Sequence, residues 1–111
     1  MHTSYEAPSA DLGTVVIRIE GELDAFAAPD LKQQLFACLD SGFNRLILEM
    51  SACTFVDSTG LGVLVAALKH ARGRELALAG PNPEIRRILQ IVGLDRVLPL
   101  YDSPTEALRH R

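Results

Sequence analysis

The sequence lacks the features that would indicate a disulfide framework or a metal centre. It has two cysteines, Cys38 and Cys53, which form no CxxC pattern, and three histidines that lie far apart. This arrangement predicts neither structural disulfides nor a zinc site. We therefore expect no metal and no bound cofactor, and a reducing cytoplasm as the compartment.

Long apolar segments are also missing. The longest unbroken apolar run is Val63–Leu68, much shorter than the roughly 20 residues that span a bilayer. Residues 1–12 do not place a basic segment before an apolar one, as a secretory signal peptide does. The sequence thus predicts no signal peptide and no membrane anchor.

Positive charge is scarce, with 11 Lys and Arg against 14 Asp and Glu and a formal net charge of −3. This balance gives no basic surface for nucleic acid and no polybasic segment for an anionic membrane, so we expect neither partner. The charge is also uneven. Residues 1–57 contain nine acidic and three basic residues, whereas residues 58–111 contain five and eight.

What the sequence does have suits one small domain. It has 111 residues, of which 48% are hydrophobic and 23% charged. Domains cluster at about 100–150 residues, and this composition is that of an ordinary globular core. We expect a single domain over residues 1–111.

Short β-branched and apolar runs predict five strands. In the second of them, Val15, Ile17 and Ile19 share one face, while Arg18 and Glu20 point to a wetter one. The first is expected to be an edge strand, because it contains a proline, and a turn at residues 11–13 leads out of it. The predicted strands are Tyr5–Ala10, Val15–Glu20, Leu46–Met50, Glu75–Ala79 and Val97–Tyr101.

Apolar residues at helical spacing, with capping residues before them, predict four helices. Asn82 before Pro83 marks one helix start, Gly93 marks the end of the same helix, and Ser103 with Glu106 has the spacing of a capping box. Phe36 lies off the apolar stripe of the first helix and is expected to be partly buried. The predicted helices are Ala28–Asp40, Ser58–Arg72, Pro83–Val92 and a short one after Ser103.

Strands and helices therefore alternate after an initial pair of strands. Parallel strands joined by right-handed crossovers are the simplest way to pack that order. The expected fold class is α/β, with a mixed five-stranded sheet that is mostly parallel, has an antiparallel N-terminal edge and packs against four helices.

The turn Asp57-Ser58-Thr59-Gly60 is the strongest candidate for a functional site. It follows a buried strand and begins the most apolar helix, and such turns are where α/β sheets usually meet ligands and partners. The simplest interpretation is that Asp57 or Ser58 caps the helix. A phosphate-binding loop is disfavoured, because Gly60 and Gly62 have one residue between them and no lysine follows until Lys69.

A serine nucleophile would need a nearby base. His70 lies about 18 Å further along the same helix at about 1.5 Å per residue, and Val56 occupies a position that a nucleophile elbow gives to glycine. The remaining interpretation is that Ser58 accepts a phosphate, since a helix N-terminus tolerates negative charge. We expect no enzymatic activity.

Three segments together resemble a known family. Gly21-Glu22-Leu23-Asp24, Ala28-Pro29-Asp30-Leu31 and Phe55–Gly62 are similar, in order and spacing, to the anti-sigma factor antagonists, the small single-domain members of the STAS superfamily. The resemblance covers nearly the whole chain, and its Asp-Ser-Thr-Gly-Leu element is the most specific part.

The resemblance implies partner switching in the control of transcription. In that family the unphosphorylated antagonist binds an anti-sigma factor that is also a serine kinase of the GHKL type, and the sigma factor is released. The kinase, with its own ATP and Mg²⁺, phosphorylates the serine that corresponds to Ser58. The antagonist then dissociates, and a metal-dependent serine phosphatase restores it.

The same resemblance assigns Ser58 as the phosphorylation site. If the strand that ends at Leu23 neighbours the strand that leads to Asp57, the two acids Asp24 and Asp57 share one end of the sheet with Ser58, and that end is the expected partner-binding surface. Asp24 has an alternative role as a turn acid, and Leu61 as a core residue. The family also suggests another function, an accessory subunit of a transporter ATPase or of a stress-signalling scaffold, with no phosphorylation of Ser58. The expected partner-binding residues are Asp24, Asp57, Ser58, Thr59, Gly60, Leu61 and Gly62.

Overall fold

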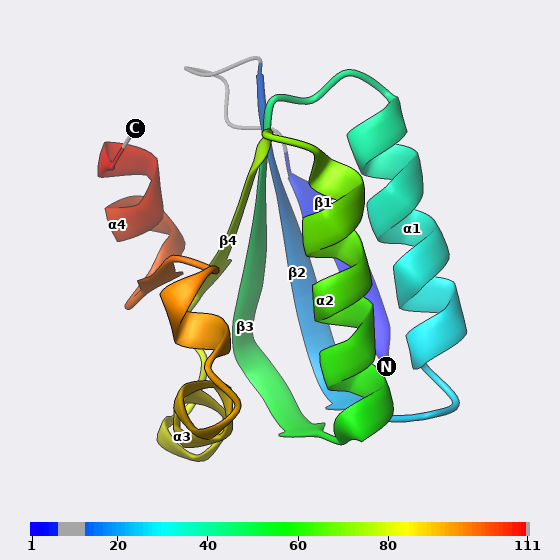
Figure 1. The fold of residues 1–111 in the computed structure, drawn as a ribbon, viewed down its shortest axis with the longest axis vertical. Coiled ribbons are helices and arrows are strands. Elements are labelled where there is room, and N and C mark those ends of the chain that lie inside the picture. The colour runs from blue at the N-terminus through cyan, green and yellow to red at the C-terminus, as the bar shows by residue number, and fades with distance from the viewer. Residues whose placement is uncertain (7–12, 111) are drawn as a thin grey trace.

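The computed structural model describes residues 1–6 and 13–110. These residues form one five-stranded sheet in the order β1-β2-β3-β4-β5, in which β1 is antiparallel to β2 and all other neighbours are parallel (Figure 1). The predicted mixed sheet with an antiparallel N-terminal edge is confirmed. The strands are β1 His2–Glu6, β2 Thr14–Leu23, β3 Arg45–Val56, β4 Glu75–Ala79 and β5 Leu100–Tyr101.

The described part of the chain also contains the four predicted helices and a short 3₁₀ turn, η1. Two capping predictions are confirmed: the Asn82 side chain accepts a hydrogen bond from the Ile85 amide at 2.8 Å, and the Ser103 hydroxyl accepts one from the Glu106 amide at 3.1 Å. Gly93 follows α3 with a φ of 81°, as a helix-ending glycine does. The helices are α1 Ala28–Asp40, α2 Ser58–Ala71, α3 Pro83–Ile91, η1 Leu94–Arg96 and α4 Pro104–Arg109.

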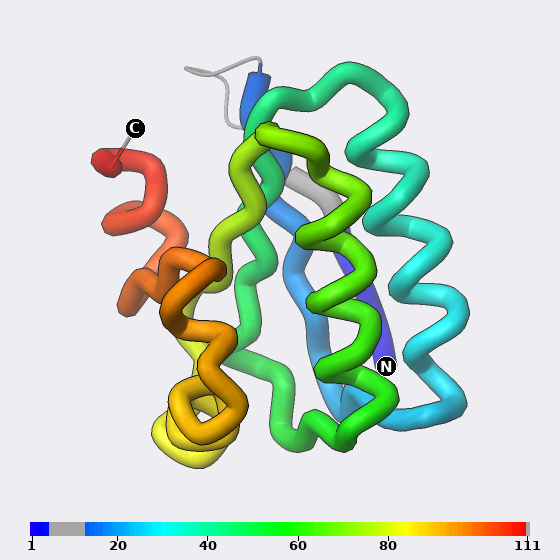
Figure 2. The backbone as a smooth tube through the Cα atoms, viewed as in Figure 1, coloured from blue at the N-terminus to red at the C-terminus, as the bar shows by residue number. Residues whose placement is uncertain are grey.

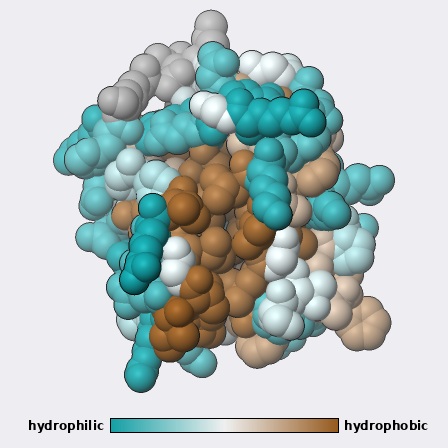
Figure 3. Space-filling view, viewed as in Figure 1, coloured by the Kyte–Doolittle hydropathy of each residue, from teal (hydrophilic) through white to brown (hydrophobic). Residues whose placement is uncertain are grey.

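The two faces of the sheet are covered unequally. Alternate residues of β2, among them Val15, Ile17 and Ile19, point into a large core formed with α1, α2, α3 and η1. Val16 points the other way, into a smaller cluster with α4. Figure 2 shows α1 and α2 side by side along their length, with both N-termini at the same end of the sheet. On the surface, hydrophobic residues gather between α2 and the α3–η1 segment (Figure 3).

The first strand differs from its prediction. The sequence predicts Tyr5–Ala10, whereas β1 spans His2–Glu6 and pairs with β2 from His2 opposite Glu20 to Glu6 opposite Val16. Residues 7–12, which include most of the predicted turn at residues 11–13, lie outside the described part of the chain. A polar segment such as His2-Thr3-Ser4 has no apolar alternation, so backbone pairing at the sheet edge gives little signal in the sequence.

The last strand is also shorter than predicted. Val97–Tyr101 is expected to be extended, but β5 consists only of Leu100–Tyr101. The preceding residues turn through η1, where the amide of Leu98 donates to the Leu94 carbonyl at 2.8 Å. Leu98 is buried and Val97 is exposed. The first part of the apolar run therefore forms a turn, and only its last two residues pair as a strand.

The strand β3 is longer than the predicted Leu46–Met50. Its pairing with β4 ends at Glu49, but its pairing with β2 continues through Leu23 opposite Val56, with two register shifts along the way. The sheet therefore ends in a two-stranded extension made of β2 and β3 alone. The small and polar residues of Ser51–Thr54 conceal this extension in the sequence.

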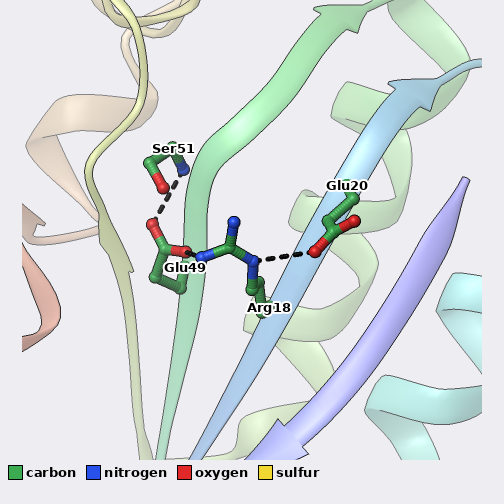
Figure 4. A network of polar contacts seen from close by, with 4 residues as sticks. All are labelled: Arg18, Glu20, Glu49 and Ser51. Atoms are coloured by element: carbon green, nitrogen blue, oxygen red, sulfur yellow. Dashed lines mark hydrogen bonds and ion pairs between the residues drawn. The ribbon is translucent and has the colours of Figure 1, made fainter.

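A polar network lies where the extension begins (Figure 4). Glu49 is buried, and both of its carboxylate oxygens have partners: Arg18 Nη1 at 3.3 Å and the Ser51 amide at 2.8 Å. Arg18 also pairs with Glu20 at 3.0 Å. The Glu49 side chain thus accepts a backbone amide just beyond the last β3–β4 pair, which compensates its burial. Arg18 and Glu20 lie on the face opposite the large core, as predicted.

At the opposite, amino end of the sheet a buried guanidinium joins three elements. Arg45, the first residue of β3, is 5% exposed. Its Nη2 donates to the carbonyl oxygens of Ala107 and His110 at the end of α4. Its Nε lies 2.9 Å from a carboxylate oxygen of Glu75, as an ion pair whose N–H is not directed at that oxygen. Arg45 therefore fixes the C-terminal helix to the sheet.

Within the described residues, no helix combines the length and the apolar character needed to cross a membrane.

Candidate functional site

The candidate site lies at the carboxyl ends of β2 and β3. Leu23 and Val56 are the last paired residues of these strands, and the Asp57 amide donates to the Leu23 carbonyl at 3.3 Å. The next residue on each strand is an aspartate, Asp24 or Asp57. The predicted placement of both acids and Ser58 at one end of the sheet is therefore confirmed.

Asp57 is the residue that caps α2. One oxygen of its carboxylate accepts a hydrogen bond from the Gly60 amide at 2.9 Å, and its backbone is extended, as an N-cap residue requires. Its carbonyl accepts from the Leu61 amide at 3.0 Å. Of the two residues that the sequence offers as the cap, the structure selects Asp57.

Ser58 is consequently not used as a cap. It is the first residue of α2 and is exposed. Among the interactions recorded for the described residues, none involves its hydroxyl, nor the backbone amides of Ser58 and Thr59. The first-turn amides of a helix have no partner within the helix, and they can donate hydrogen bonds to an anion placed at the helix N-terminus. A hydroxyl with this exposure is open to modification, and free amides lie next to it.

Asp24 organises the loop between β2 and α1. One oxygen of its carboxylate accepts from the amides of Phe26 and Ala27, each at 3.0 Å. Its carbonyl accepts from the Ala28 amide at 2.9 Å, so the loop leads directly into α1. The alternative role of Asp24 as a turn acid is thus real, and the residue remains partly exposed at the same end of the sheet as Asp57.

The two glycines of the turn have different surroundings. Gly60 is buried, and a Cβ placed on it would lie 2.6 Å from the carbonyl oxygen of Leu23, closer than real atoms approach. The absence of a side chain therefore lets α2 approach the end of β2. Gly62 is exposed, and a Cβ there would meet nothing within 4 Å. Gly60 is therefore needed for packing, whereas Gly62 faces open space. A contact of either glycine with a partner protein remains a prediction.

Thr59 and Leu61 differ in the same way. Thr59 is exposed and, with Gly62, lines a shallow groove of about 350 Å³ between α1 and α2. Leu61 is partly buried and packs against the large core, so both of its expected roles retain support. The α1 side of the groove consists of Ala28, Pro29 and Lys32.

The chemistry available near Ser58 is limited. His70 is engaged at the far end of α2, where its Nε2 lies 2.7 Å from Asp40 and its ring stacks on the half-buried Phe36 at 4.0 Å. Burial raises the pKa of the Cys53 thiol, which makes it a weak nucleophile. No three His, Cys, Asp or Glu side chains gather as a metal site in the described part of the chain.

Two exposed aromatic residues at this end of the sheet are missing from the sequence-based site. Phe26, in the loop that Asp24 organises, is 94% exposed, and Phe55, next to the end of β3, is 48% exposed. Phe26 has alanines on both sides, Ala25 and Ala27, so nothing in the local pattern distinguishes it from a core residue.

Comparison with known proteins points to one family. The STAS domain model matches residues 7–107. The anti-sigma-B factor antagonist of Listeria monocytogenes is 33% identical over 108 residues, which cover 96% of this chain and 95% of that protein.

Solved structures agree in fold. The crystal structure of an anti-sigma factor antagonist from Mycobacterium paratuberculosis has a TM-score of 0.88 at 29% identity and covers 97% of this chain and 91% of its own. Bacillus SpoIIAA has been solved in an unphosphorylated form, with a TM-score of 0.80 over 96% of this chain and 93% of that one, and in a phosphorylated form, with 0.76 over 99% and 100%. Both forms are 24% identical to this chain, so they show the fold alone.

Proposed function

The chain belongs to the STAS domain family, and on that premise we propose that it is an anti-sigma factor antagonist whose binding is switched off by phosphorylation of Ser58. Its relatives bear the name of anti-sigma factor antagonists. The observation that supports the switch most directly is that different residues cap α2 and present the hydroxyl. Asp57 caps the helix, which leaves the Ser58 hydroxyl exposed for a kinase.

The geometry favours a phosphate that leaves the fold intact. A phosphoserine adds about −1.5 to −2 charges and three acceptor oxygens at neutral pH. At Ser58 these oxygens meet the first-turn amides of a 14-residue helix, and a helix N-terminus stabilises a nearby anion by about 0.3–1 kcal/mol. Because Asp57 makes the cap, no hydrogen bond of the unmodified protein has to break.

The same phosphate is unfavourable for a bound partner. It adds negative charge to a surface that already has the carboxylates of Asp24 and Asp57. A charge buried in an interface without a matching cation costs several kcal/mol, and about 1.4 kcal/mol is already a tenfold change in affinity. Electrostatic repulsion and desolvation are therefore sufficient to release the partner.

The partners follow from the family resemblance. The kinase is an anti-sigma factor of the GHKL type that brings its own ATP and Mg²⁺, and a metal-dependent serine phosphatase removes the phosphate. The protein is then a substrate and a binding partner, and not a catalyst. The surface that such a kinase has to cover lies at the same end of the sheet as Ser58 and includes Asp24, Thr59, Leu61 and Gly62, while the buried Gly60 packs against the end of β2.

The test is phosphorylation by the anti-sigma factor kinase of the same organism. Incubation with ATP and Mg²⁺ should add one phosphate to the chain by intact mass, and none to Ser58→Ala. Thr59→Ala removes the other hydroxyl of the turn and is the control for the acceptor: whatever its effect on kinase binding, it should still gain one phosphate by the end of the reaction. A phosphate that persists on Ser58→Ala would overturn the assignment, and an unmodified wild type would favour the accessory-subunit function.

A further inference from the structure

Phe26 lies at the same end of the sheet as Ser58 but has no part in the proposed phosphorylation switch. Phe26 is 94% exposed, more than any other large hydrophobic residue recorded in the described part of the chain. A single exposed apolar side chain is common on protein surfaces. Its meaning therefore depends on how the backbone holds it and on what surrounds it.

The backbone at Phe26 is held on both sides. The Asp24 carboxylate accepts from the Phe26 and Ala27 amides, and Ala27 and Ala28 are buried at the start of α1. A ring displayed from a fixed loop loses little conformational entropy on binding. Aromatic residues presented in this way are typical anchors of protein interfaces.

The surroundings of Phe26 are acidic. It lines a shallow hollow of about 370 Å³ with Met1, Glu22, Asp24, Ala27 and Asp30. Three of these six residues have carboxylates, against one amine, the α-amino group of Met1. An aromatic ring with acids around it complements an apolar pocket that has basic groups at its rim.

The hollow and Ser58 are adjacent. Asp24 and Asp57 follow paired strand ends, and the Asp57 amide donates to the carbonyl of Leu23, the residue before Asp24. A kinase that brings ATP to Ser58 therefore also faces the loop that displays Phe26.

We propose that Phe26 is the aromatic anchor by which the unphosphorylated chain docks on this kinase, in an apolar pocket with a basic rim. The inference rests on the proposed function, since it concerns the same partner. It gives the hydrogen bonds of the Asp24 turn a second role, because they position the backbone of Phe26 as well as the start of α1. The ring supplies affinity, the acids orient the complex, and the phosphate on Ser58 opposes it.

The experiment measures the affinity of the ADP-loaded kinase for the full chain and its variants by calorimetry. Phe26→Ala should weaken binding by about 30-fold or more, as loss of an interface anchor does. Phe26→Leu should recover part of the affinity. Ile91→Ala removes a residue that is 73% exposed on α3, and is the matched control expected to bind as the wild type does.

The basic rim has its own test. Glu22→Gln should reduce the association rate several-fold at low salt, and the difference should disappear at high salt, because exposed charges act through a screened field. A Glu22→Gln association rate equal to that of the wild type at low salt would remove the basic rim from the proposal.

The outcomes separate the two proposals. Phosphorylation of Ser58 in the wild type together with unchanged affinity of Phe26→Ala would overturn the anchor and leave the switch standing. A wild type that neither binds the kinase nor accepts a phosphate would overturn both. Unfolding curves of Phe26→Ala and wild type should coincide, since the ring contributes almost nothing to the core.

Discussion

The two ends of the sheet use charged side chains in opposite ways. At the amino end, Arg45 is buried and connects β3 with Glu75 and with the last carbonyls of α4. At the carboxyl end, the hydrogen bonds that the described residues give to the Asp24 and Asp57 side chains come from the backbone of their own turns, and both acids remain partly exposed. One end uses charge to fix distant elements together, and the other uses it to shape short loops.

This difference indicates at which end of the sheet the fold tolerates an added charge. A charge that arrives at the amino end would disturb the buried guanidinium of Arg45 and its pair with Glu75, whereas a charge that arrives at Ser58 meets first-turn amides and solvent. The carboxyl end also extends beyond the rest of the sheet as the β2–β3 pair. Modification there can alter the surface without altering the core.

The largest effect on stability should come from the amino end. Arg45→Met removes the guanidinium donor to the Ala107 and His110 carbonyls and the cationic partner of Glu75, and we expect a loss of about 3 kcal/mol in the free energy of unfolding in urea. Arg86→Met, which breaks the exposed pair with Asp102, is the control and should change stability by less than about 0.5 kcal/mol. Equal losses in both variants would erase the contrast between the two ends.

A smaller but clear effect is expected for the packing glycine at the carboxyl end. Gly60→Ala places a methyl group against the Leu23 carbonyl and should cost about 2 kcal/mol, because backbone cannot rotate away as a side chain can. Gly62→Ala has open space and should be neutral or stabilising by up to about 1 kcal/mol. Thermal unfolding of the pair measures the difference, and a tolerated Gly60→Ala would show that α2 is not fixed against β2.

The capping acid should matter less for stability. Asp57→Ala removes the side-chain acceptor for the Gly60 amide and should cost about 1 kcal/mol, whereas Asp57→Asn keeps an acceptor and should stay close to wild type. Urea titrations of the two variants separate the cap from the charge. If Asp57→Asn loses as much as Asp57→Ala, then the charge and not the hydrogen bond is the main contribution.

The smallest structural effect should follow phosphorylation itself. Backbone amide chemical shifts in heteronuclear NMR should change at residues 57–62 and in the adjacent loop of residues 24–27. Arg45 and the C-terminal helix should be unaffected, because Asp57 already caps α2. Shifts spread over the whole sheet would show that the two ends are coupled.

The sequence is informative wherever a local signal exists. The Asn82 and Ser103 caps, Gly93 and the alternation in Val15–Glu20 each follow from chemistry within a few residues, and the structure confirms them. The turn at Asp57 and Ser58 was located for the same reason. Short-range patterns therefore predict which segments are helices and which are strands. The order of these elements then predicts the mixed sheet.

Other features depend on contacts between distant segments. Whether Asp57 or Ser58 caps α2 depends on where β3 ends, and the Asp57 amide fixes that point by donating to the Leu23 carbonyl. The length of β3 depends on β2, and the position of β1 depends on backbone pairing that apolar patterning does not report. Phe26 has no local signal, because the hydrogen-bonded turn and the acidic hollow around it form only when Asp24 and α1 are in place.

The most direct test of the switch is the affinity of the ADP-loaded anti-sigma factor kinase for two forms of the chain, unmodified and phosphorylated on Ser58. The account predicts that the phosphate weakens binding by at least about 100-fold, which corresponds to about 2.7 kcal/mol. Ser58→Ala should bind as the unmodified form does, and Ser58→Asp should bind poorly. Equal affinity of the phosphorylated and unmodified chains would contradict the account.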